Sequence, residues 1–362
     1  MRVAARSWPL WVLLLAGCAS HSPTVSSPED AHALIEQLLP RGVSDRQGWV
    51  NDIFNGFTLQ GLDPTRERVC AVMAVTEQES GWQVNPVIPG LGGIARKEID
   101  QRAEHAGVPL MMVHGALNLS SRGGRTYAER IAAARTEKDL SDIYEDFIGS
   151  VPLGHRLFDS YNPVRTRGPM QVNVAFANSY AATRTYPYPV KVSIADELFS
   201  RRGSVYFGIA HLFAYRAPYE SNLYRFADFN AGQYASRNAA FQNAVSAATG
   251  TQVVPDGALL PHDTAVVGAT EAALAQIAGK LNLSEESIHA ALEQGKTQDF
   301  ERSALYRRVF ELARNARGGP LPYASIPRIQ LHGPKISRVL TTDWYAHRVD
   351  GRYNSCLRRA PS

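Results

Sequence analysis

Apolar side chains recur every three or four residues through most of the chain, which is the spacing of an amphipathic helix. The clearest patterns lie at about 29–39, 45–59, 65–80, 95–106, 126–137, 139–148, 195–216, 269–279, 284–294 and 298–315, and one more ends near residue 248. The tail after residue 318 has irregular periodicity, and the chain has no internal repeat. The pattern therefore predicts a mainly α-helical protein.

The third predicted helix has recognisable ends and one face suited to a core. Asp63 and Pro64 predict its start, as an N-cap residue followed by a proline at the first helical position. Gly81 predicts its end, because glycine readily adopts the left-handed conformation that closes many helices. The positions that we expect to face the core share helical spacing and are Val69, Val72, Met73 and Thr76.

Glu79 lies in the last turn of this helix. The negative end of the helix dipole and the scarcity of water both disfavour a charged carboxyl group there. A glutamic acid that stays protonated near neutral pH can serve as a general acid. The alternative is a carboxylate that simply points into solvent. Glu77 is expected on the opposite side, because two residues turn a helix by about 200°.

The N-terminus carries Arg2 and Arg6, an apolar run from Trp8 to Ala16, and then Gly17-Cys18. This arrangement resembles a bacterial lipoprotein signal peptide, which implies cleavage after residue 17 and lipidation of Cys18. An ordinary secretory signal cut nearby is the alternative. Ala19 after the cysteine implies the periplasmic face of the outer membrane in this lipoprotein class. Residues 18–28 are expected to form a tether, and no later segment is apolar enough to span a membrane.

Composition limits the partners and the redox state. The chain has 362 residues and a formal charge of +4, which becomes +2 when residues 1–17 are removed with Arg2 and Arg6. A nearly neutral protein without a long basic run is not expected to bind nucleic acid.

Besides Cys18 the chain has two cysteines, Cys70 and Cys356, which in an oxidising compartment are expected to form a disulfide bond. Two free thiols are the alternative.

Three short motifs follow one another along the chain: Glu79-Ser80-Gly81-Trp82, Arg167-Gly168-Pro169-Met170-Gln171-Val172 and Phe229-Asn230-Ala231-Gly232. In order and content they resemble the Glu-Ser-x-aromatic, Arg-Gly-Leu-Met-Gln-Ile and Tyr-Asn-Ala-Gly elements of soluble lytic transglycosylases and goose-type lysozymes. The whole chain also resembles a family of bacterial lipoproteins without a settled activity.

The resemblance implies a lysozyme-like helical domain at 29–250, interrupted by an insertion at 83–160 that has no strong core pattern of its own. Residues 251–362 would form a partly helical extension packed on this core. Almost ninety residues separate the first two motifs, where the family has a short loop, and Pro169 lacks the amide hydrogen of the family's leucine. The family also places a tyrosine near its acid, for which Tyr323 and Tyr345 are the candidates.

The resemblance implies cleavage of peptidoglycan glycan strands without a cofactor or metal. A single acid, Glu79, would protonate the glycosidic oxygen and then deprotonate the sugar's own C6 hydroxyl group, which leaves an anhydro end. Hydrolysis would usually need a second carboxylate, for which Asp159 and Asp228 are the candidates. The histidines show no metal-ligand spacing. A non-catalytic module that binds peptidoglycan or an envelope protein is the alternative.

The same motifs supply the expected substrate-binding residues, each with a structural alternative. Gln171 and Asn230 are expected to contact sugar groups or to stabilise their turns. Ser80 is expected to bond near the acid or to cap a turn. The remaining three are expected to contact sugar or to pack in the core: Trp82, Met170 and Phe229.

Overall fold

The computed structural model of the chain describes residues 27–150, 156, 162–261, 263, 266–333 and 338–359. The predicted signal peptide, Cys18, most of the tether and Asp159 lie outside these residues. The described residues form a mainly α-helical protein, as predicted, with two short antiparallel strand pairs. No described helix is both long enough and apolar enough to cross a membrane.

The main core is a cluster of helices around α3. It contains α1 (Pro28–Leu38), α2 (Arg46–Thr58), α3 (Arg66–Ser80), α9 (Val174–Thr183), α10 (Ile194–Glu197), α11 (Arg201–Phe213), α12 (Asn222–Ala231) and α19 (Thr342–Leu357). Every residue of α3 from Val69 to Thr76 is buried. The helix is therefore enclosed on all sides, whereas the sequence pattern predicted one buried face.

The helix that carries Glu79 begins two residues later than predicted. Thr65 is its N-cap, and the Thr65 side chain accepts a hydrogen bond from the Arg68 amide. The predicted end is confirmed, because Gly81 closes the helix in the left-handed conformation with φ 57°. The helix α2 begins one residue later than predicted, with Asp45 as its N-cap.

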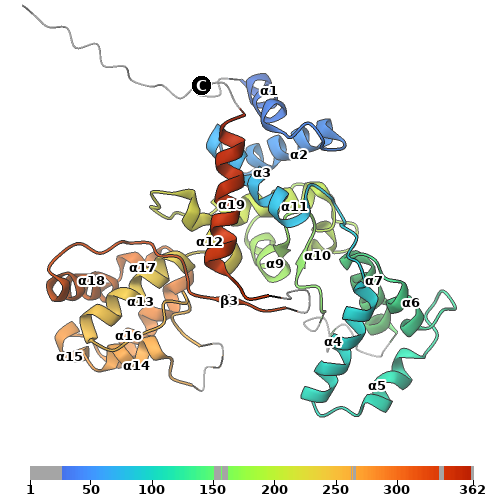
Figure 1. The fold of residues 1–362 in the computed structure, drawn as a ribbon. Coiled ribbons are helices and arrows are strands. Elements are labelled where there is room, and N and C mark those ends of the chain that lie inside the picture. The colour runs from blue at the N-terminus through green and yellow to red at the C-terminus, as the bar shows by residue number, and fades with distance from the viewer. Residues whose placement is uncertain are drawn as a thin grey trace, which may run out of the picture.

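Residues 83–150, the continuous described part of the insertion, form a group of four helices beside the main core (Figure 1). They are α4 (Leu91–His105), α5 (Leu110–Leu117), α6 (Tyr127–Ala133) and α7 (Glu137–Gly149). Contrary to the sequence prediction, this group has a small core of its own, made of Leu117, Tyr127, Ile131, Ala134 and Ile143. The pattern missed α5, because Leu117 is its only fully buried residue and its other apolar side chains do not repeat with one buried face.

The C-terminal part divides between two cores. The helices α14 (Ala269–Ala275), α15 (Ala278–Leu281), α16 (Glu285–Glu293), η2 (Gln294–Lys296), α17 (Asp299–Arg302) and α18 (Ala304–Arg317) pack with α13 (Ala235–Thr249) around a second core. The chain then passes through the β3–β4 pair (Gln330–Leu331 and Leu340–Thr341) into α19. Figure 1 shows α19 in red beside α3, far from the other C-terminal helices.

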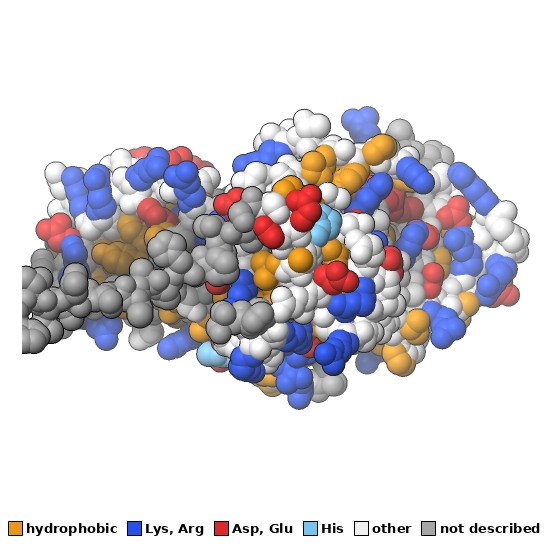
Figure 2. All heavy atoms as spheres, turned by 90° about the horizontal axis from the view of Figure 1, so that it is seen from above, with side chains coloured by type: hydrophobic (Ala, Val, Ile, Leu, Met, Phe, Trp, Pro, Cys, Tyr) orange, Lys and Arg blue, Asp and Glu red, His pale blue; other side chains and the backbone are white. Residues whose placement is uncertain are grey.

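Charged side chains are mixed over the face seen in Figure 2. Basic and acidic groups alternate there and do not gather into one large patch of either sign. This distribution agrees with the small net charge of the chain.

Candidate active site

Glu79 meets a tyrosine from the other end of the chain. The Tyr345 hydroxyl group donates a hydrogen bond of 2.5 Å to Glu79 Oε1. Tyr345 is itself buried, in the first turns of α19, so its ring and hydroxyl group are held in place. The structure thus selects Tyr345 from the two tyrosine candidates. Tyr323 is half exposed and packs on Phe310 in the second core.

The surroundings of Glu79 favour its protonated form. Withdrawal of the carboxyl group from water is the main cause, and it raises the pKa of Glu79 from 4.5 to about 7. The hydrogen bond from Tyr345 acts in the opposite direction, while the negative charge of Glu137 raises the pKa further. A carboxyl group with this pKa is present in both protonation states near neutral pH, which suits an acid that must later act as a base.

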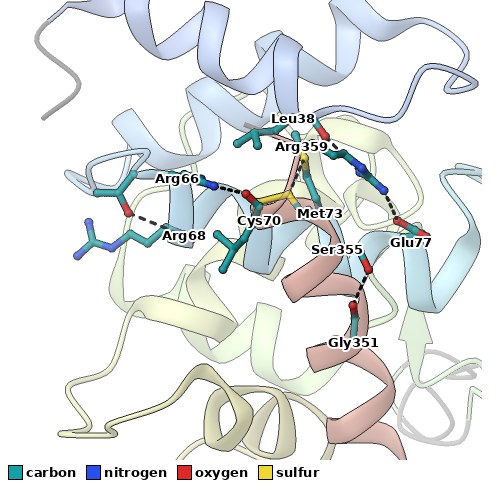
Figure 3. The surroundings of a disulfide bond; sticks show 12 residues. Leu38, Arg66, Arg68, Cys70, Met73, Glu77, Gly351, Ser355 and Arg359 are labelled. Carbon is teal, nitrogen blue, oxygen red and sulfur yellow. Dashed lines mark hydrogen bonds and ion pairs between the residues drawn. A yellow bond between two sulfur atoms is a disulfide. The ribbon is translucent and has the colours of Figure 1, made fainter. Parts of the chain in front are cut away.

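A disulfide bond fixes the two helices that bring Glu79 and Tyr345 together. Cys70 and Cys356 are joined, with their Cα atoms 5.5 Å apart, so the predicted pairing is confirmed (Figure 3). Cys70 lies near the start of α3 and Cys356 near the end of α19, whereas Glu79 and Tyr345 lie at the opposite ends of these helices. The helices are therefore antiparallel, with the disulfide at one end of the pair and the candidate acid at the other.

Glu77 faces away from the candidate acid. Its carboxylate lies 3.7 Å from the Arg359 guanidinium group, on the side of α3 drawn in Figure 3. Both side chains of this pair are about one-third exposed. The prediction that Glu77 and Glu79 face different sides of the helix is confirmed.

The second motif forms a hairpin between β1 (Thr166–Arg167) and β2 (Val172–Asn173). Its turn begins at Gly168, where φ is 74° and the Leu198 carbonyl group leaves no room for a side chain. The backbone N–H group of Gln171 donates a hydrogen bond to the Gly168 carbonyl oxygen, and this bond closes the turn. Pro169 therefore sits at a position of the turn where the missing amide hydrogen leaves this closing bond intact.

The side chain of Gln171 links the hairpin to the insertion. Gln171 Oε1 accepts a hydrogen bond of 2.8 Å from Thr166, and Gln171 Nε2 donates one of 2.8 Å to Glu137 Oε2. Glu137 is the first residue of α7, which Thr136 and Asp139 start with a capping box. The insertion thus places a carboxylate beside the second motif, close enough for its charge to raise the pKa of Glu79.

Sequence reasoning missed Glu137 as a second carboxylate. It considered Asp159, which lies outside the described residues, and Asp228. Asp228 is buried and accepts hydrogen bonds from Tyr215, Tyr219 and two backbone amides, so it fixes the loop after α12. These bonds give Asp228 a structural role, and they use both of its carboxylate oxygens. The capping pattern at Thr136 would have predicted the start of α7, but not its contact with Gln171.

Three of the expected substrate-binding residues are core residues. Trp82 packs edge-to-face on Trp49 with their rings 5.0 Å apart, and Phe229 packs on the His211 ring. Met170 is completely buried against Gly208. The expected sugar contacts of Trp82, Met170 and Phe229 are corrected to packing, because none of the three is more than 8% exposed.

Ser80 and Asn230, the remaining motif residues, differ in their surroundings. Ser80 is buried, and its hydroxyl group donates to the Thr76 carbonyl oxygen one turn earlier in α3, which is a local structural role. Asn230 is exposed, and its Oδ1 accepts a hydrogen bond of 2.8 Å from Thr342 at the start of α19. The third motif is thus tied to the helix that carries Tyr345, and the exposed Asn230 remains accessible to a ligand.

A metal site finds no support in the part of the chain that the structure describes. No group of three or more His, Cys, Asp or Glu side chains there could hold an ion. The arrangement around Glu79 offers acid–base chemistry with a tyrosine donor and a neighbouring carboxylate.

Comparison with known proteins assigns the chain to a family. A family model described as "Protein of unknown function (DUF1615)" matches residues 42–359. The chain belongs to the DUF1615 family. It is 48% identical over 354 residues to the "Uncharacterized protein YaiW" of Escherichia coli (strain K12), and the match covers 97% of each chain. No solved structure matches it.

The DUF1615 chain allows a direct test of the tyrosine contact. The hydroxyl group of Tyr345 stabilises the charged form of Glu79, so Tyr345→Phe should raise the pKa of Glu79 and move the alkaline limb of the rate profile to higher pH. Loss of a hydrogen bond to a charged group, worth about 1.5–3 kcal/mol, should also lower the maximal rate by roughly 10- to 100-fold. The measurement is the rate against pH of the peptidoglycan digestion that is proposed below.

Tyr323→Phe is the matched control for this experiment, because Tyr323 is exposed and belongs to the second core. It should leave both the maximal rate and the pH profile unchanged. An unchanged profile in Tyr345→Phe would show that the contact with Glu79 has no part in turnover.

Proposed function

We propose that this protein is a lytic transglycosylase that cleaves the glycan strands of peptidoglycan, with a lysozyme-like main core and Glu79 as its acid and base. One observation carries the proposal: a single glutamic acid with a pKa near 7 accepts a hydrogen bond from a buried tyrosine. The order of the three motifs supports the same reaction.

The proposed reaction has two proton transfers. Protonated Glu79 gives its proton to the glycosidic oxygen, which is a poor leaving group until it is protonated. The resulting carboxylate then takes a proton from the C6 hydroxyl group of the same sugar, whose oxygen closes onto the anomeric carbon. Tyr345 stabilises the carboxylate between the two transfers, because its hydroxyl group donates to Glu79 Oε1. In this proposal Gln171 and Asn230 are the motif residues that contact the sugar.

A second candidate is a hydrolase in which Glu137 activates water. The position of Glu137 beside Gln171, together with its effect on the pKa of Glu79, is the observation that favours it. Glycosidases that hydrolyse commonly use two carboxyl groups on opposite sides of the scissile bond. The transglycosylase proposal needs no such group.

Glu137→Gln separates the two candidates. In a transglycosylase it should keep the rate within a few fold and move the alkaline limb to lower pH, because the negative charge of Glu137 raises the pKa of Glu79. In a hydrolase it should reduce the rate by roughly 100-fold or more. The measurement is the release of soluble fragments from purified peptidoglycan across the pH range. A large loss at every pH would decide for the hydrolase.

Purified peptidoglycan also serves to test whether the protein is an enzyme at all. Purified peptidoglycan incubated with the mature protein should release soluble glycan fragments with turnover. Protein that sediments with the peptidoglycan and releases nothing would instead be the binding module considered above.

We also propose that the protein is anchored through lipid on Cys18 at the periplasmic face of the outer membrane. The residues around Cys18 support this proposal. Cys18→Ala should therefore move the protein from the membrane fraction to the soluble fraction of fractionated cells. A variant that stays entirely with the outer membrane would contradict the anchor.

A further inference from the structure

The inserted helices enclose a cavity of about 920 Å³. Its walls come from α4, α5, α6 and α7 and from residues 163–166. The walls are mostly aliphatic and aromatic, and they include Ile94, Ile99, Val113, Ile131, Leu140 and Phe147. The insertion therefore surrounds an apolar space next to the hairpin that carries Gln171.

The size of this space distinguishes it from a packing defect. Protein interiors are packed as densely as organic crystals and contain few voids larger than a water molecule. The cavity instead falls within the roughly 300–1,000 Å³ of small-molecule sites, which are mostly apolar with a few polar groups. Among the described residues of the insertion, the buried cluster is small and holds five hydrophobic residues. An occupant of the cavity would complete the packing of these helices.

Exposed apolar side chains of the cavity lining lie on α5 and just before it. Val108 and Met112 both line the cavity, and they are 40% and 64% exposed. Met111 beside them is 83% exposed. Methionine side chains adapt to irregular apolar partners. A hydrocarbon chain that enters here would cover exposed apolar surface and fill the space behind it.

Another part of the cavity lining is polar. Glu98 and Arg102 neutralise each other there through a 2.7 Å ion pair, and Glu137 accepts the hydrogen bond from Gln171. Arg165 and His332 line the same cavity and are exposed. The guanidinium group of Arg165 is permanently charged, which favours an anionic group at this wall.

We propose that this cavity binds one hydrocarbon chain of an anionic amphiphile, with the apolar chain between α4, α5 and α7 and the anionic head group at Arg165. The proposal is independent of glycan cleavage, because it needs only the cavity and its polar wall. An acyl chain of a phospholipid and the prenyl chain of a polyprenyl phosphate share this chemistry.

The test is a titration with cis-parinaric acid, a fatty acid whose fluorescence rises in apolar surroundings, on the mature chain with Cys18→Ala so that no detergent is needed. The wild-type cavity should bind one probe molecule per chain. Ala95→Trp places an indole ring inside the cavity from α4 and should weaken binding at least tenfold. Ala133→Trp is the matched control, because Ala133 is exposed on α6 and does not line the cavity, and it should change the affinity by less than twofold.

Additional variants and competitor lipids test the position of the head group and identify the lipid class. Ala116→Trp fills the cavity from α5 and repeats the test should Ala95→Trp fail to fold. Arg165→Gln should weaken the probe by severalfold but leave an uncharged detergent of equal chain length unaffected. Lysophosphatidylglycerol and a polyprenyl phosphate are then each used to displace the bound probe. The lipid that displaces it at the lower concentration shows which class of lipid the cavity prefers. The proposal is overturned by the absence of saturable binding, by displacement with neither lipid, or by an equal loss in Ala133→Trp.

Discussion

Replacing Glu79 by glutamine should reduce the release of fragments from peptidoglycan by at least the roughly 100- to 10,000-fold that general acid catalysis supplies. Glutamine matches the shape of the protonated acid but can neither give nor take the proton. The fold should be kept, because the neutral amide can still accept a hydrogen bond from Tyr345. Initial rates with purified peptidoglycan give the size of the loss.

Glu77→Gln is the control, since Glu77 faces Arg359 on the other side of α3. It should keep the rate within a few fold. A large loss in Glu77→Gln, together with normal activity in Glu79→Gln, would reverse the roles of the two faces of α3 and remove the basis of the proposed function.

The variant Glu79→Gln should also change how the stability of the protein depends on pH. Glu79 has a pKa of about 7 in the folded protein, against 4.5 in water. Folding therefore favours the protonated form, so this stability is fully present below pH 4.5 and is lost as the pH rises through 7. Glu79→Gln should match the wild type below pH 4.5 and exceed it above pH 7 by up to about 3 kcal/mol, at about 1.4 kcal/mol per pH unit. Denaturant unfolding at both pH values measures the difference.

Removing the disulfide bond by Cys70→Ser and Cys356→Ser should have the largest effect on stability. The bond joins residues 286 positions apart, and chain-entropy reasoning assigns so long a loop up to about 5 kcal/mol of unfolding free energy. The melting temperature should fall, and the contact between Glu79 and Tyr345 should loosen, because both depend on the pairing of α3 with α19. Thermal unfolding with and without reductant measures the first effect.

Thiol labelling provides the control for the disulfide. In denatured but unreduced protein with Cys18→Ala, neither remaining cysteine should react. Full labelling of both would show that the bond is absent and that other contacts hold α19 against α3.

Local patterns predicted the helix of the candidate acid well. Its periodicity and Gly81 placed Glu79 in a last turn, and the two-residue offset placed Glu77 on the other face. The expected export and the cysteine count predicted the disulfide bond, because Cys70 and Cys356 are the two cysteines besides Cys18. These conclusions needed only neighbouring residues or simple counting.

The partners of Glu79 could not be predicted in this way. Tyr345 follows Glu79 by 266 positions in the sequence, so no local pattern links the two residues. The apolar residues of α19 are scattered, so no clear helical periodicity marks this helix in the C-terminal tail. Glu137 reaches the site because the first turn of α7 lies beside the hairpin, a long-range contact that no local signal encodes. Trp82, Met170 and Phe229 were misassigned because a motif shows residue type but not whether a side chain is buried.

Mass spectrometry of the fragments that the wild-type protein releases from purified peptidoglycan tests the central claim most directly. A single acid and base at Glu79 predicts anhydro ends, lighter by one water than hydrolysis products, and no such fragments from Glu79→Gln. Reducing ends would contradict the transglycosylase reaction and point to Glu137. No released fragment at any pH would contradict catalysis by this protein.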